Sequence, residues 1–152
     1  MDLKRIKSFQ VDHTKLVPGL YLSRVDGDCT TYDLRMKKPN SGDYFDTGTG
    51  HTFEHLLATF VRSGEFSENI IYAGPMGCRT GFYLVVKELS ESDLIKLVQN
   101  SMKFISNYSG EIPGATEREC GNYRDQNLDG AKKLAFEYAR VIENWSAEDL
   151  KY

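Results

Sequence analysis

The residues best suited to chemistry lie in the pentapeptide His-Thr-Phe-Glu-His at residues 51–55. His51 and His55 are four residues apart, so on a helix their imidazoles lie one above the other on the same face. Two imidazoles placed in this way can bind one metal ion, and Glu54 between them can move protons beside it. The chain has only three histidines, and two of them occupy this motif, which favours a metal site over two unrelated surface histidines.

Two histidines do not complete a metal site, and the remaining candidate ligands are Cys78, Cys120 and His13. Cys120 lies in a polar segment that we expect to form a loop. Cys78 lies in the glycine-rich segment 74–81, where the backbone can approach a ligand closely. Arg79 follows Cys78 directly and could favour its thiolate, which is the reactive form.

Three classes of protein could use such a set of residues. The first is an enzyme whose metal keeps an open position. The second is a metallopeptidase, because His-x-x-Glu-His is the inverted zincin order. The third is a non-catalytic module whose structural metal is enclosed by His51, His55, Cys78 and Cys120. Glu54 argues against the third class, because an enclosed metal needs no adjacent base. A cysteine as third ligand, with no obvious carboxylate ligand on a following helix, argues against the second.

The pattern of apolar residues predicts strands before the motif and a helix over it. Leu20, Leu22 and Val25 indicate one strand, and the alternation over Thr30–Met36 indicates another. Asp-Gly-Asp at residues 26–28 predicts a hairpin between them. Residues 39–50 are rich in turn formers and predict a loop, and residues 51–62 predict the metal-ligand helix.

The second half of the chain predicts two more strands and two more helices. The strands are expected at residues 69–73 and 82–89, and the helices at residues 90–105 and 128–145, separated by a loop. The order predicts an α+β fold, in which a mainly antiparallel sheet packs against helices. We expect a single domain with the metal-ligand helix in the middle of the chain.

Length and charge narrow the function further. The 152 residues suit one domain, over residues 1–152, that can bury a core without disulfides. The net charge of -3 and the scattered basic residues argue against a nucleic-acid partner. No apolar run approaches the roughly 18 residues that a membrane span needs, and the first residues are polar, unlike a secretion signal. We therefore expect no membrane partner and a cytoplasmic location, which the odd number of cysteines, three, also favours.

The motif and its companions resemble the S-ribosylhomocysteine lyase (LuxS) family. His-Thr-Phe-Glu-His-Leu at residues 51–56 is followed by Pro-Met-Gly-Cys-Arg-Thr-Gly-Phe-Tyr at residues 75–83 and by Glu-Cys-Gly at residues 119–121, in the order seen in that family. Ser-Phe-Gln-Val-Asp-His at residues 8–13 resembles the family's opening motif. Tyr-Asp-Leu-Arg at residues 32–35 resembles its Phe-Asp-hydrophobic-Arg segment. The resemblance runs from the opening motif through the last helix, which is nearly the whole chain.

The resemblance implies which residues form the metal and acid–base site. It implies one divalent metal ion per subunit, with Fe(II) favoured and Zn(II) or Co(II) possible, on the ligands His51, His55 and Cys120. It also implies that Glu54 and Cys78 are the catalytic pair. Because a lyase needs an open metal position, the chemistry favours Cys78 as a base and not as a fourth ligand.

The resemblance also implies a substrate, a reaction and an assembly. The reaction cleaves S-ribosylhomocysteine to homocysteine and 4,5-dihydroxy-2,3-pentanedione, the precursor of the quorum-sensing signal autoinducer-2, by metal-assisted carbonyl migration and β-elimination of the thioether. Ser8, His13 and Arg35 match positions that line the substrate site. The implied partner is a second copy of the chain, in a homodimer with active sites at the interface.

Overall fold

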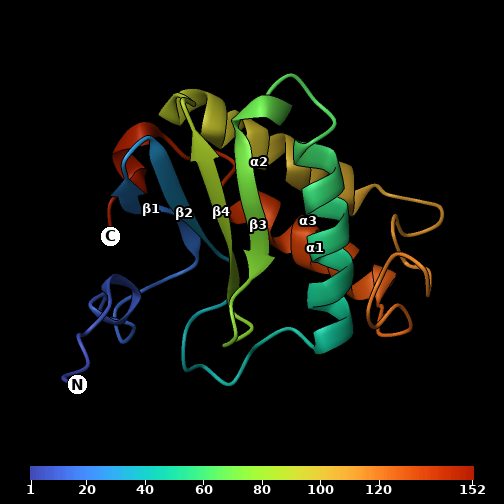
Figure 1. The fold of residues 1–152 in the computed structure, drawn as a ribbon, viewed down its shortest axis with the longest axis horizontal. Helices are drawn as coiled ribbons and strands as arrows, with labels where there is room; N and C mark the ends of the chain where they lie inside the picture. The colour runs from blue at the N-terminus through green and yellow to red at the C-terminus, as the bar shows by residue number, and fades with distance from the viewer.

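A four-stranded antiparallel sheet in the order β1-β2-β4-β3 forms the centre of the computed structural model, which describes residues 1–152 (Figure 1). The strands are β1 (Gly19–Asp26), β2 (Cys29–Arg35), β3 (Ile70–Pro75) and β4 (Gly81–Lys87). Each neighbouring pair of strands runs antiparallel. The predicted antiparallel α+β fold is therefore confirmed.

The predicted hairpin joins β1 to β2. Asp26 pairs with Cys29, so Gly27 and Asp28 form a two-residue turn. Gly27 has a φ of 61°, a conformation that such tight turns require and that glycine adopts without strain. The hairpin sets the register of β2, which pairs along its other edge with β4.

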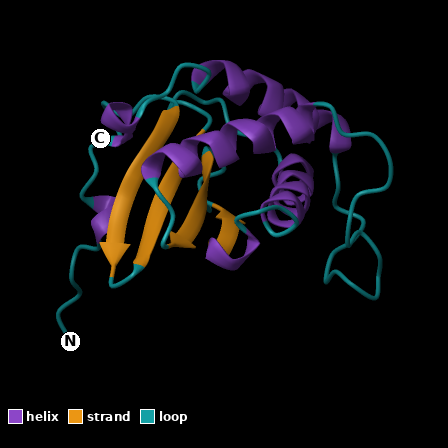
Figure 2. Ribbon diagram, turned by 90° about the horizontal axis from the view of Figure 1, so that it is seen from above, coloured by secondary structure: helices purple, strands orange, loops and turns teal.

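Three α-helices complete the fold, namely α1 (Thr47–Val61), α2 (Glu91–Ser106) and α3 (Leu128–Val141). Helices α2 and α3 cover one face of the sheet, and α1 lies beside them next to β3 (Figures 1 and 2). None of the helices combines the length and the apolar character that a bilayer crossing requires. The opposite face of the sheet carries no α-helix (Figure 2).

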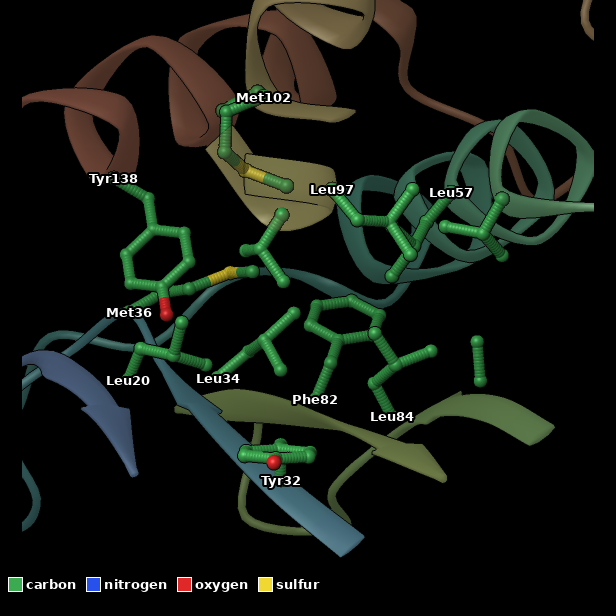
Figure 3. Close-up of a cluster of buried hydrophobic side chains, with 14 of the residues drawn as sticks. Leu20, Tyr32, Leu34, Met36, Leu57, Phe82, Leu84, Leu97, Met102 and Tyr138 are labelled. Carbon is green, nitrogen blue, oxygen red and sulfur yellow. The ribbon is translucent and has the colours of Figure 1, made fainter. Parts of the chain in front are cut away.

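The core fills the space between the sheet and the helices. Leu34, Phe82 and Leu84 from the strands meet Leu57 of α1 and Met102 of α2 there, and all five are fully buried (Figure 3). Because side chains alternate along a strand, the positions between them point to the opposite face of the sheet. That second face receives the polar residues of β2 described below.

Helix α1 begins four residues earlier than the predicted start at His51. The extra turn contains Gly48 and Gly50, which normally disfavour a helix. A Cβ at Gly50 would lie 2.8 Å from the Phe45 ring, and one at Gly48 would lie 3.2 Å from the backbone of Gln126. The close packing of this turn thus requires glycine and overrides the local preference.

Helix α3 ends earlier than predicted, at Val141 instead of Trp145. Trp145 instead donates its indole N–H to the carbonyl of Leu20 on β1, at 2.7 Å. This contact, with the buried Leu150 of the following short helix, fixes the end of the chain against the sheet. The apolar spacing correctly predicted that Trp145 packs against the core, where it is partly buried, but not its secondary structure.

Candidate functional site

The first turn of α1 precedes the two histidines, so both lie within the regular part of the helix. Asp46 caps the helix by accepting the backbone N–H of Thr49 at 2.8 Å and the Thr49 hydroxyl at 2.9 Å. The pKa of Asp46 is lowered, chiefly by the hydrogen bond from the Thr49 backbone. Because the helix is established before the motif, His51 and His55 lie one turn apart with their rings 4.6 Å from centroid to centroid.

Three side chains converge into a candidate metal centre. The Cys120 Sγ lies 3.3 Å from His51 Nε2 and 3.9 Å from His55 Nε2. All three ligand atoms lie within 4.8 Å of one another. A tetrahedral ion with normal metal–nitrogen and metal–sulfur bonds separates such atoms by about 3.5 Å. The donor set and its spacing therefore fit one divalent ion, as the sequence predicted for these three residues.

Backbone carbonyls orient both imidazoles. His51 Nδ1 lies 2.8 Å from the Asp125 carbonyl, and His55 Nδ1 lies 2.6 Å from the Pro113 carbonyl. A carbonyl can only accept, so each ring carries its proton on Nδ1 and leaves the Nε2 lone pair free for a metal. Sequence reasoning missed these two partners, because a carbonyl oxygen is present at every residue and gives no signal.

The loop that carries Cys120 is attached to α1 by a buried threonine. The Thr52 hydroxyl donates to Gln126 Oε1 at 2.7 Å and accepts from the Asn127 backbone N–H at 2.8 Å. Gly114, with a φ of 70°, lies against the His55 ring, where a Cβ would be 3.3 Å from Nδ1. Thr52 stands inside the predicted motif, but its role in holding the loop emerges only from the structure.

A cavity of about 900 Å³ contains the other predicted residues. Its lining includes Ser8, His13, Arg35 and Cys78. Cys78 is an exposed residue in the turn between β3 and β4, and its Sγ lies 3.1 Å from the Thr80 hydroxyl. The structure thus gathers the predicted base and the three predicted substrate residues in one place.

The cation beside Cys78 is Arg35 and not the neighbouring Arg79. Arg35 Nη1 lies 3.8 Å from Cys78 Sγ, while the Arg79 guanidinium stacks over the Tyr44 ring at 4.5 Å from its centroid. Arg79 has a φ of 57° in the β3–β4 turn. The sequence suggested a cation near Cys78, but only the pairing of β2 with β4 shows that this cation is Arg35 of β2.

Arg35 is itself buried, with 2% of its surface exposed. Its Nε and Nη2 donate to the two oxygens of Asp33 at 3.1 and 2.8 Å, and its Nη1 donates to the Thr80 hydroxyl at 2.8 Å. Burial alone lowers the pKa of Arg35, but the hydrogen bond and charge of Asp33 outweigh it and raise that pKa. Direct contact of Arg35 with substrate stays a prediction.

Within one chain, the metal cluster and the Cys78 cavity are separate. The cavity lining contains no metal ligand and does not contain Glu54. The loop that carries Cys120 lies on the far side of α1 from the sheet, while the β3–β4 turn lies at the end of the sheet (Figures 1 and 2). Cys78 is not part of the cluster of His51, His55 and Cys120, so one chain does not form a closed four-ligand site.

The chain is similar to known proteins over nearly its whole length. A family model described as S-Ribosylhomocysteinase (LuxS) matches residues 6–149. The S-ribosylhomocysteine lyase of Borrelia garinii subsp. bavariensis is 47% identical over 156 residues, which cover 99% of both chains. The proteins of the same name from Finegoldia magna and Clostridium acetobutylicum are 46% and 44% identical, again with 99% of both chains covered.

Proposed function

Because the chain belongs to the S-Ribosylhomocysteinase (LuxS) family, we propose that it cleaves S-ribosylhomocysteine to homocysteine and 4,5-dihydroxy-2,3-pentanedione, an autoinducer precursor. The observation that carries the proposal is the convergence of His51, His55 and Cys120, with oriented imidazoles, in a chain 47% identical to a protein named for this lyase. Residues 1–152 act as one metal-dependent lyase domain. Its three free thiols suit the reducing cytoplasm.

The proposed metal is one divalent ion per subunit, held by the three ligands described above. When bound, it supplies a Lewis acid that polarises a carbonyl oxygen of the sugar. Imidazole and thiolate ligands admit iron, zinc and cobalt, so the preference for Fe(II) rests on the family resemblance. Three protein ligands leave an open position, as the proposed lyase requires.

Glu54 and Cys78 are the proposed acid–base pair. Moving the carbonyl from C1 to C2 and then to C3 requires a proton to leave one carbon and another to be returned to its neighbour in each step. With the carbonyl at C3, removal of the C4 proton breaks the C5–sulfur bond and releases homocysteine thiolate, which takes up a proton. A thiolate at Cys78 suits removal of protons from carbon, and Glu54 serves transfer at other positions.

The remaining cavity residues are proposed to bind the substrate. His13 lies with Nδ1 2.8 Å from the Val11 carbonyl, so its proton is on Nδ1 and its Nε2 is free to accept from a sugar hydroxyl. Ser8 lines the same cavity and can donate or accept a hydrogen bond. Arg35 brings its positive charge to the cavity wall beside Cys78.

We further propose a homodimer with active sites at the interface. A single substrate has to reach both the metal ligands and Cys78, which belong to separate groups of residues in one chain. In a two-fold dimer, the cavity of each subunit can face the metal cluster of the other, which gives two equivalent sites. The cavity lining also exposes two large aromatic residues for such a contact, Phe9 (65%) and Tyr44 (55%).

The test is an assay of the protein purified without oxygen and loaded with Fe(II). With S-ribosylhomocysteine in heavy water, we expect homocysteine release, read by a thiol reagent, and deuterium at C2 of the sugar. Cys78→Ala should bind metal normally but block both signals, because the first proton transfer fails. A wild-type protein that carries the ion but releases no homocysteine would reject the proposed activity.

A further inference from the structure

A continuous line of hydrogen bonds connects Cys78 to Tyr152, the last residue of the sequence. Tyr152 donates its hydroxyl to Asp33 Oδ2 at 2.7 Å. Asp33 accepts two donors of Arg35, and Arg35 donates to the Thr80 hydroxyl, as described above. Because the Thr80 oxygen accepts from Arg35, its own proton is free to point to the Cys78 sulfur, 3.1 Å away. Tyr152 and two nitrogens of Arg35 thus donate to Asp33, while Arg35 Nη1 and the Thr80 hydroxyl link the guanidinium to Cys78.

Tyr152 is held in place by more than this hydrogen bond. Its ring stacks on Tyr21 with centroids 5.1 Å apart and an interplanar angle of 20°. Leu150, two residues earlier, is buried in the core. Tyr152 as a whole is 49% exposed, and its hydrogen bond to Asp33 is partly buried. Partial burial of the hydroxyl, followed by the charge of Asp33, raises the pKa of Tyr152 far above that of a free tyrosine. The Tyr152 hydroxyl is therefore a protonated donor at neutral pH.

The charges along the line explain why this donor matters. Asp33 is 1% exposed, and a buried carboxylate is costly unless its lone pairs are occupied. Arg35 fills one side of the carboxylate, and Tyr152 supplies a third donor. If that donor is lost, less of the negative charge of Asp33 is neutralised. Asp33 then draws more strongly on the positive charge of Arg35, and its own charge disfavours a thiolate at Cys78.

We propose that Tyr152 is a positioning residue, which acts through Asp33 and Arg35 to hold Cys78 in the thiolate form. The proposal rests on the proposed function, in which Cys78 is the base. It assigns a chemical role to a residue outside all five segments that carried the resemblance. It also gives Asp33 a role, as the link between the tyrosine and the guanidinium.

Other titratable groups face this line from the elements around it. These are Tyr21 on β1, Tyr83 on β4, Tyr138 on α3, and three groups around the cavity, His13, Asp43 and Tyr44. Tyr21 is the matched control, because its hydroxyl donates to the Val17 carbonyl at 2.9 Å and not to Asp33. Tyr21→Phe therefore removes a hydroxyl from the same aromatic stack without breaking the line.

The experiment compares Tyr152→Phe, Tyr21→Phe and wild type as metal-loaded proteins. Alkylation of Cys78 by iodoacetamide is followed across pH and assigned by peptide mass mapping. Tyr152→Phe should react about threefold to tenfold more slowly at neutral pH, because a rise of about one unit in the pKa of the Cys78 thiol lowers the thiolate fraction about tenfold. At high pH, where the thiol is fully ionised in both proteins, the variant should reach the wild-type rate. Tyr21→Phe should overlay wild type. Overlapping profiles for Tyr152→Phe and wild type, or an equal displacement in Tyr21→Phe, would overturn the proposal.

The pH dependence of turnover provides a second readout that a structural role would not move. Homocysteine release by Tyr152→Phe should fall at neutral pH and recover at higher pH, with melting temperatures similar in the two tyrosine variants. A uniform loss at every pH would contradict the positioning role. The alkylation profile needs no substrate, so it decides the role of Tyr152 even if wild type releases no homocysteine and the proposed activity itself is rejected.

Discussion

At the scale of single residues, the candidate metal centre depends on one thiolate added to a pair of imidazoles. Cys120 supplies that thiolate from a loop, whereas the two histidines are fixed on a helix. Contacts between the histidine rings and backbone carbonyls on either side of Cys120 hold its loop in position, and so does the hydrogen bond from Thr52 to Gln126. The ligand set is therefore complete only when loop and helix are docked.

We predict that Cys120→Ala loses the ion. Two imidazoles remain, and removal of a ligand should weaken binding by more than the roughly 10- to 100-fold that loss of an outer partner costs. Metal content of the purified protein checks this. Cys29→Ala is the matched control, because the Cys29 thiol lies at the β1–β2 hairpin beside Asp28 and should leave metal content unchanged. Full occupancy in Cys120→Ala would remove this residue from the site.

The sequence predicted the metal ligands but not the groups that orient them. Histidine spacing and cysteine count are visible in a sequence because ligands need particular side chains. The carbonyls of Pro113 and Asp125 and the cation supplied by Arg35 depend on which segments meet in space. These groups come from segments far apart in the chain, so their proximity to the ligands or to Cys78 emerges only from the fold.

At the scale of elements, α1 carries both candidate metal ligands His51 and His55 and also contacts the loop that carries Cys120. Its first turn holds no part of the motif, yet it determines where the motif lies on the helix. The sequence favoured a loop there because of the glycines, and tertiary packing against Phe45 and Gln126 reversed that preference. The sheet was easier to predict, because alternation and an Asp-Gly turn are local signals that agree with the final pairing.

We predict that Asp46→Ala destabilises the protein by about 1 kcal/mol, the usual loss for a helix cap, and weakens metal binding. Asp46→Asn, which can still accept from Thr49, should retain most of the stability. Urea unfolding of the metal-free proteins measures the first effect, and metal titration the second. An unchanged stability in Asp46→Ala would show that the cap does not stabilise α1.

The same cap has a predictable pH dependence. The Asp46 pKa is lower in the folded state, chiefly through the Thr49 backbone hydrogen bond, so the charged cap stabilises the fold above the ordinary aspartate range. This contribution is lost as pH falls through the lowered pKa. The stability difference between wild type and Asp46→Ala should therefore shrink in acid.

At the scale of the whole molecule, the chain carries two separate groups of candidate residues, which the proposed homodimer would combine as half-sites of one active site. The metal half-site contains His51, His55 and Cys120, with Glu54 on the same helix. The thiol half-site is the cavity that contains Cys78. Helix α1 lies between the metal loop and the sheet, so a second copy is the simplest way to bring the two halves to one substrate. The central claim is that each active site takes one half from each subunit.

Mixed dimers test this claim most directly. Glu54→Gln and Cys78→Ala chains, each inactive alone with metal bound, would carry different affinity tags and be purified together after subunit exchange. One of the two sites in each mixed dimer then has both a native Glu54 and a native Cys78, so homocysteine release should return to about half the wild-type rate. Mixed dimers as inactive as either parent would contradict the claim, because each site would then draw both groups from the same chain.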